Sequence, residues 1–185
     1  MTILPREFYA RDTVTVAKKL LGKKIIRKIG KQEISGIITE TEAYRHKDDP
    51  ASHAFNKMTE RNKAMFNEVG CSYVYFTYGM YYCFNIVAKT PKIAAGAVLI
   101  RAMIPEKGIK VMQNNRGNVK LENISNGPAK LAQALNISKD QYGLDLTVKS
   151  KLYITDGITP KKIVVSPRIG ISKATDKLWN FKIKN

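Results

Sequence analysis

The chain has 185 residues, 44% of them hydrophobic and 9% aromatic, which fits a single globular domain over residues 1–185 and excludes disorder of the whole chain. Lysine and arginine number 32 against 15 aspartates and glutamates, so the formal net charge is +17. This excess favours a polyanionic partner such as a nucleic acid, although a genome biased toward lysine would leave the same signature.

The cysteines and the apolar runs do not indicate a secreted or a membrane protein. Residues 1–7 lack the basic and then apolar layout of a signal peptide, and no apolar run reaches transmembrane length. Cys71 and Cys83 lack CxxC spacing and are too few for a disulfide framework, so both are expected to be reduced packing residues. We expect a soluble protein, cytoplasmic if the organism is bacterial.

A helix is predicted near the N-terminus. Asp12 is a candidate N-cap, residues 13–21 carry apolar side chains at helical spacing, and Gly22 is a stop signal. Residues 23–31 should then form a strand and a turn.

The next strand, residues 38–44, carries most of the candidate chemistry. Side chains alternate along a strand, so one face should present Ile38, Glu40, Glu42 and Tyr44. A carboxylate beside an aromatic ring could deprotonate a water next to a stacked base. Alternating threonine and glutamate is also the usual pattern of a solvent-exposed face, which is the competing interpretation.

Residues 45–51 are rich in turn-forming residues. The following segment, Ser52–Phe66, includes His53 and is expected to form one short helix, and residues 67–70 are expected to form a loop. Residues 71–87 predict a β-hairpin with a two-residue turn at Gly79-Met80 and Tyr78 at its tip. Strand packing explains most of its tyrosines but explains Tyr78 poorly, because a ring at the tip has few neighbours. On a basic DNA-binding face this ring could insert between base steps.

The second half of the chain predicts short elements. A buried strand over residues 97–104 should end at Pro105, residues 108–123 should be partly helical, and Asn126-Gly-Pro128 should open a helix. Three further strands are expected at residues 152–154, 163–165 and 169–171, followed by a basic tail.

Two histidines and several carboxylates close together in the sequence make a metal site an alternative interpretation. His46 and His53 lie near Glu40, Glu42, Asp48 and Asp49, but their spacing matches no specific zinc pattern. A metal-dependent nuclease using Glu40, Glu42 and Asp49 is therefore one competing reading, and a non-catalytic basic nucleic-acid-binding module is another.

Several motifs together resemble one enzyme family, the alkyladenine (methylpurine) DNA glycosylases, in order from about Leu20 to Trp179. The motifs are Glu40-Thr-Glu-Ala-Tyr44, Asp49-Pro-Ala-Ser-His53, Arg61-Asn62 with Met65-Phe66, Tyr73-Val-Tyr-Phe-Thr-Tyr-Gly-Met-Tyr81, Cys83-Phe-Asn85, Leu99-Ile-Arg-Ala102, Asn126-Gly-Pro-Ala-Lys-Leu131 and Pro167-Arg-Ile-Gly-Ile171. The chain departs from the family's usual pattern at residues 59–61, 67–70 and 178–181. These departures affect loops more than the residues of a base pocket.

The resemblance implies a monomeric base-excision repair enzyme that flips alkylated or deaminated purines from double-stranded DNA and hydrolyses the N-glycosidic bond without a metal or cofactor. Glu42 would activate the water, and Tyr78 would be the intercalating wedge. Base contacts would come from Tyr44, His53, Tyr75 and Asn85. Water or phosphate contacts would come from Arg101, Lys130 and Arg168.

The expected fold is a single-domain α+β fold. It should contain a curved, mainly antiparallel β-sheet, a protruding β-hairpin and surrounding helices.

Overall fold

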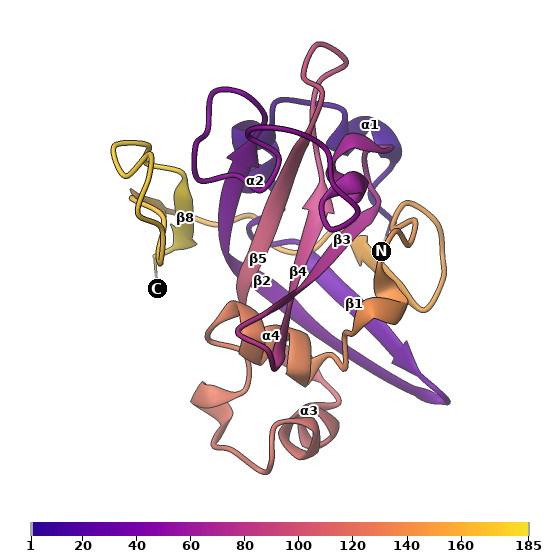
Figure 1. Ribbon diagram of the computed structural model, residues 1–185. Coiled ribbons are helices and arrows are strands. Elements are labelled where there is room, and N and C mark those ends of the chain that lie inside the picture. Colours follow the sequence, from indigo (N-terminus) through magenta and orange to yellow (C-terminus); the bar gives the residue numbers. More distant parts are fainter. Residues whose placement is uncertain (1, 185) are drawn as a thin grey trace.

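A computed structural model describes residues 2–184, and Figure 1 shows a curled antiparallel sheet with helices packed against it. The helices are α1 (Arg6–Tyr9), α2 (Thr13–Leu20), α3 (Ile109–Asn115) and α4 (Pro128–Ala134), with short 3-10 turns η1 (Lys63–Phe66), η2 (Leu121–Asn123) and η3 (Lys139–Gln141). The strands are β1 (Lys24–Ile29), β2 (Gln32–Arg45), β3 (Ser72–Thr77), β4 (Tyr81–Val87), β5 (Gly96–Lys107), β6 (Leu152–Thr155), β7 (Ile163–Ser166) and β8 (Asn180–Ile183). The predicted α+β fold is confirmed.

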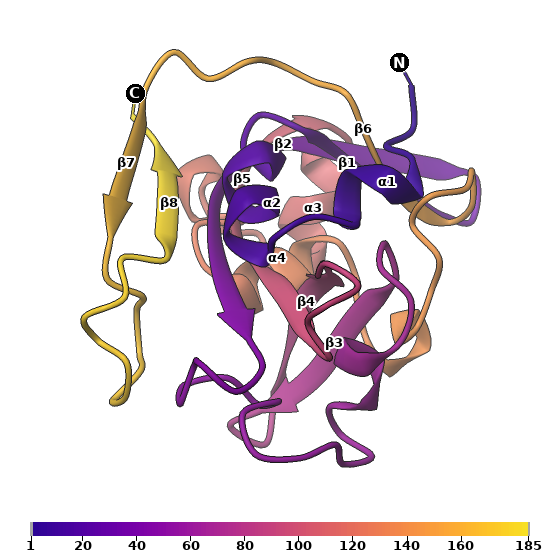
Figure 2. The ribbon, with the colours of Figure 1, turned by 90° about the horizontal axis from the view of Figure 1, so that it is seen from above.

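The strand order is β3-β4-β5-β2-β1-β6, and a two-stranded ribbon of β7 and β8 joins through β8 to β2. Strand β2 pairs with β5 along most of its length and with β1 and β8 over parts of it, so it lies at the centre of the topology. Figure 2 shows α2 against β2 and β5, with the β7–β8 ribbon to one side. No helix within residues 2–184 is long and apolar enough to cross a membrane.

Helix α2 forms where the sequence predicts it. The side chain of its N-cap, Asp12, accepts a hydrogen bond from the Thr15 backbone N–H at 3.1 Å, which satisfies a donor that the helix itself leaves free. Its apolar face is buried, and Thr41 Oγ1 donates to the Ala17 carbonyl at 2.8 Å. These contacts fix β2 against the helix.

Three register shifts interrupt the β2–β5 ladder, and two of them compensate each other. Ile38 pairs with Met103 and Glu40 with Ala102, which leaves Thr39 extra on β2, and Thr41 then pairs with Ile100, which leaves Arg101 extra on β5. Bulges of this kind redirect side chains. Ile38 therefore packs in the same core cluster as Ala43, and the prediction that Ile38 shares a face with the glutamates is wrong.

The β3–β4 hairpin differs from its prediction in one residue. Thr77 pairs with Tyr81, so the tip has three residues, Tyr78, Gly79 and Met80, instead of two. Tyr78 and Gly79 both have positive φ, at 50° and 66°, a conformation that glycine adopts freely and tyrosine does not. The position of Tyr78 at the tip is confirmed.

Two other predictions were wrong. Pro105 does not end its strand: β5 continues to Lys107, and Pro105 pairs with Gly36 beside a register shift, where the ladder tolerates a missing N–H. Residues 169–171 are a turn and not a strand, whereas the basic tail contains β8, which pairs with both β2 and β7. The short helix expected within residues 52–66 is present as the four-residue 3-10 helix η1.

Candidate active site

One cavity of about 380 Å³ opens where β2, β3, β4 and β5 meet the segment that follows β7. This volume is within the usual range of small-molecule sites, roughly 300–1,000 Å³. The lining residues include four that the sequence singled out as base contacts together with the predicted wedge and one of the predicted water or phosphate contacts: Tyr44, His53, Tyr75, Asn85, Tyr78 and Arg101. Residues 169–171 close another side.

Glu42 is completely buried and accepts four hydrogen bonds. Its Oε2 accepts from the Tyr44 hydroxyl at 2.8 Å and from Arg101 Nη1 at 3.3 Å. Its Oε1 accepts from the Ile169 backbone N–H at 2.8 Å and from Asn180 Nδ2 at 3.0 Å. All four partners are donors, which is the environment that a buried carboxylate requires.

Glu42 itself does not line the cavity; it lies just behind the wall. Three of its four donors, Tyr44, Arg101 and Ile169, are lining residues. The carboxylate is thus separated from the cavity by a single layer of hydrogen-bonding groups, and it does not face bulk solvent.

The aromatic residues form the walls. The rings of His53 and Tyr75 meet edge to face with centroids 4.6 Å apart, and His53 Nδ1 lies 2.9 Å from the Tyr73 hydroxyl. Burial, with a smaller contribution from the charge of Arg61, lowers the pKa of His53, which favours the neutral ring. Burial likewise raises the pKa of the Tyr44 and Tyr75 hydroxyls, so both remain protonated donors.

Asn85 is buried in β4 and faces the cavity, with its Nδ2 donating to the Tyr73 carbonyl at 3.0 Å. This hydrogen bond orients the amide. The polar interruption of an otherwise apolar strand is therefore explained by a position in the cavity wall.

The three predicted water or phosphate contacts have different surroundings. Arg101 is mostly buried and lines the cavity, with its Nε donating to Glu40 at 2.9 Å. Lys130 donates to the side chain of Asn126 at 2.8 Å in an exposed contact on α4. The guanidinium of Arg168 has no exposed surface, so a phosphate could reach it only by displacing its protein partners.

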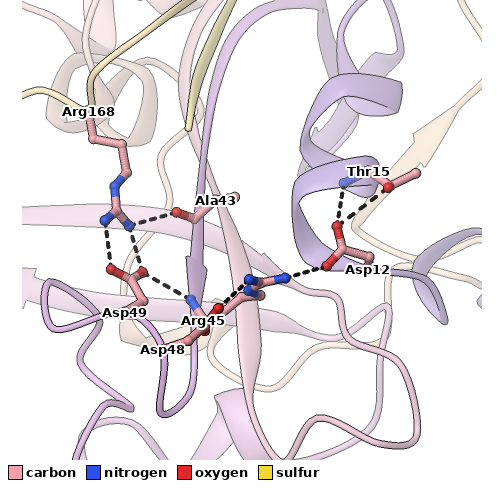
Figure 3. Close-up of polar contacts among 7 residues, drawn as sticks. All are labelled: Asp12, Thr15, Ala43, Arg45, Asp48, Asp49 and Arg168. Atoms are coloured by element: carbon pink, nitrogen blue, oxygen red, sulfur yellow. Dashed lines mark hydrogen bonds and ion pairs between the residues drawn. The ribbon is translucent and has the colours of Figure 1, made fainter. Parts of the chain in front are cut away.

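Those partners of Arg168 are shown in Figure 3. Its two Nη atoms bind the two carboxylate oxygens of Asp49 at 2.6 Å each, and Nη1 also donates to the Ala43 carbonyl at 2.8 Å. Asp49 Oδ2 further accepts from the Arg45 backbone N–H. Arg168 thus connects the turn after β2 to the segment after β7.

Sequence reasoning missed three contributors to this site. Asn180 bridges both glutamates, donating to Glu40 at 2.9 Å and to Glu42. Ile169 contributes through its backbone, which no side-chain pattern can indicate, and the Asp49–Arg168 pair joins residues 119 positions apart. A polar residue directly after the only tryptophan was the one available signal for Asn180.

The carboxylates proposed for a metal site already have protein partners. Arg101 binds Glu40 and Glu42, and Arg168 occupies both oxygens of Asp49. Within residues 2–184 no group of three or more histidine, cysteine, aspartate or glutamate side chains is arranged to hold a metal ion. Each of the three carboxylates that the nuclease hypothesis requires therefore has at least one oxygen bound to a guanidinium group.

Comparison with known proteins identifies the family of this chain. The chain matches the family model described as methylpurine-DNA glycosylase (MPG) over residues 7–185. A protein of Carboxydothermus hydrogenoformans is 48% identical over 99% of this chain and 96% of its own length, and one of Prosthecochloris aestuarii is 48% identical over 97% and 87%. A protein of Methanocella arvoryzae is 42% identical over 100% and 94%. All three bear the name "Putative 3-methyladenine DNA glycosylase". The chain belongs to the methylpurine-DNA glycosylase family.

Proposed function

We propose that this chain is a base-excision repair glycosylase that flips alkylated or deaminated purines, such as 3-methyladenine and hypoxanthine, out of duplex DNA and hydrolyses the N-glycosidic bond. Glu42 activates the attacking water. The observation that carries the proposal is the position of this buried carboxylate, one layer of donors behind a cavity with aromatic walls. The enzyme acts as a monomer, and its positive charge binds the DNA backbone.

The chemistry requires a carboxylate at this place. Breaking the glycosidic bond develops positive charge on the deoxyribose, which a nearby carboxylate stabilises while it also takes a proton from water. A cationic base such as 3-methyladenine is already a good leaving group. The protein then has mainly to extrude the base and hold the sugar and the water close to Glu42.

The water gains access to Glu42 through the cavity wall. Both donors to Oε2, Tyr44 and Arg101, line the cavity, so a water that replaces either one reaches the carboxylate from the side where the nucleotide binds. The Arg101 contact, at 3.3 Å, is the longest of the four that Glu42 accepts. We therefore assign the water to the side of Oε2 that Arg101 now occupies.

The base is held by stacking between Tyr44 on one side and His53 with Tyr75 on the other. Stacking is worth about 1–3 kcal/mol per base and offsets part of the few kcal/mol that unstacking costs. Tyr78 fills the gap that the extruded nucleotide leaves. Asn85 crowds the position of a purine 2-amino group and so disfavours guanine.

The test is to incubate duplexes that carry 3-methyladenine, 7-methylguanine, hypoxanthine or an etheno adduct with the protein in EDTA and to detect the free base. Free base together with alkali-labile abasic sites is the expected result. A protein that binds the duplexes and releases no base would be a binding module, and strand cutting that EDTA abolishes would identify a metal-dependent nuclease.

A further inference from the structure

The Asp49–Arg168 ion pair lies directly behind Tyr44. Both side chains have no exposed surface, and their carboxylate and guanidinium groups bind in a two-to-two arrangement with both distances at 2.6 Å. The guanidinium carbon lies 4.5 Å from the centroid of the Tyr44 ring and 5.2 Å from that of Trp179. The ring of a residue in the cavity wall therefore has a cation against it.

Tyr44 lines the cavity, whereas neither Asp49 nor Arg168 does, although the guanidinium is 4.5 Å from the centre of the Tyr44 ring. We infer from this that the pair lies on the side of Tyr44 away from the cavity. A base stacked on the cavity face of Tyr44 would thus have the Arg168 guanidinium behind the same ring. Adding a stacking distance to the 4.5 Å between Arg168 and the ring gives roughly 8 Å between the guanidinium and the base.

Charge at this distance matters most for a base that is itself charged. At an effective dielectric constant near 20, two unit positive charges roughly 8 Å apart repel enough to change binding by about tenfold or more. A neutral base experiences a much smaller effect. Asp49 accepts hydrogen bonds from both Nη atoms of Arg168 and so balances the charge of the guanidinium directly behind Tyr44.

We infer that Asp49 and Arg168 form a specificity-determining pair, in which Asp49 neutralises the cation behind Tyr44 so that the cavity accepts positively charged alkylated purines as well as neutral ones. The inference rests on the proposed function. The pair then does more than join the turn after β2 to the segment after β7. The balance between the charges of Asp49 and Arg168 determines whether charged or neutral bases are preferred.

The test compares two variants whose effects should have opposite signs. Asp49→Asn leaves the guanidinium unbalanced, and Arg168→Gln removes it and leaves the carboxylate. Single-turnover rates of base release are measured in EDTA for duplexes with cationic 3-methyladenine and with neutral hypoxanthine, after subtraction of spontaneous loss. If hypoxanthine release is too slow to time, the affinities for the two duplexes are compared in place of the two rates.

The ratio of the rate (or affinity) for 3-methyladenine to that for hypoxanthine should fall about tenfold in Asp49→Asn. In Arg168→Gln this ratio should rise above that of the parent protein. A purely structural pair would lower both values in proportion, and that result, or an unchanged ratio, would overturn the inference. If Asp49→Asn does not fold, Arg168→Gln alone decides, because its ratio must rise.

Asp48→Asn is the matched control. It removes the same charge one residue away, from a half-exposed carboxylate that pairs with Arg45, and it should leave the ratio unchanged. Release of neither base by the parent protein would count against the proposed function itself. Release of both bases with a ratio insensitive to residues 49 and 168 would count only against this inference.

Discussion

The centre of β2 and the tip of the β3–β4 hairpin serve the same cavity but are built in opposite ways. Glu42 has no exposed surface and four hydrogen-bond donors. Tyr78 is 87% exposed and has a backbone φ of 50°. The group assigned to the reaction is held before substrate arrives, whereas the ring of the group assigned to the DNA projects into solvent. Substitution of Glu42 should therefore lower the rate of base release and the stability of the fold. Substitution of Tyr78 should lower the affinity for duplex and leave the stability of the fold unchanged.

The largest effect is expected at Glu42. Glu42→Gln should slow base release by about 10²–10⁴-fold, the usual contribution of a general base, while affinity for a damaged duplex stays within a few fold. The amide has one acceptor atom in place of two, so donors such as Ile169 N–H and Asn180 lose a partner. Unfolding stability should fall by about 1–3 kcal/mol as a result.

Single-turnover kinetics, duplex binding and thermal melting check this prediction. Glu33→Gln is the control, since Glu33 lies on the same strand but in a partly exposed pair with Lys107. Release at the parent rate in a folded Glu42→Gln variant would remove the general base from the mechanism.

The hairpin tip should show a smaller effect with the opposite relation to stability. Tyr78→Ser should weaken binding of damaged duplex and slow excision by about 5- to 100-fold, because a ring that stacks contributes about 1–3 kcal/mol. Tyr78→Phe keeps the ring and should behave like the parent. Equal activity of the Ser and Phe variants would show that the ring is not the wedge.

Tyr78→Gly sharpens this contrast. Glycine adopts the positive φ without strain, and relief of that strain is worth about 1–2 kcal/mol, so melting temperature should not fall even though excision does. A variant that loses both stability and excision would mean that the tip is held by packing, as the centre of β2 is.

A weaker and less specific effect is expected from the basic surface. Lys130→Gln should reduce affinity a few fold for damaged and undamaged duplex alike and lower the slope of log K against log salt by about 0.9, the value for one phosphate contact. Lys31→Gln, in the β1–β2 turn, serves as the control. Equal slopes in the two variants would remove Lys130 from the DNA interface.

The smallest effect concerns His53 and pH. The pKa of His53 is lower in the folded protein than in the unfolded chain, mainly because of burial. At pH values below the usual histidine pKa of about 6.5, residue 53 therefore carries more bound proton in the unfolded chain than in the folded protein. Stability falls as the pH falls through this range. His53→Gln should reduce the decrease in melting temperature between pH 7.5 and pH 5.5. An equal decrease in the variant and the parent would contradict the assignment.

The same comparison explains what could be predicted from the sequence. Local patterns identified the hairpin and the exposed Tyr78, because a glycine at a turn and a ring beside it are properties of neighbouring residues. The Asp12 cap and the opening of α4 after Gly127 are local in the same sense. Period-two alternation also placed Glu42 and Tyr44 on one face, where their side chains are hydrogen-bonded.

The other three partners of Glu42 could not be predicted in this way. Asn180 is 138 positions from Glu42 in the chain, and Arg168 is 119 from Asp49, so only the folded topology brings them together. Ile38 was misplaced for a related reason, since one extra residue in a strand reverses the alternation and leaves no mark in the sequence. Three of the four donors to the Glu42 carboxylate are thus long-range, and only Tyr44 is a near neighbour in the sequence.

The paired irregularities in β2 and β5 also set how this site can change. Thr39 and Arg101 are each one residue more than the opposite strand accommodates, and together they keep the ladder in step on either side. Deletion of Thr39 alone would put the two strands out of step and direct Ala43 toward the cavity and Glu42 toward the core. Losing a residue from each strand restores alignment but removes the guanidinium that now contacts both glutamates. Insertions and deletions are therefore excluded from this part of the sheet far more strictly than substitutions.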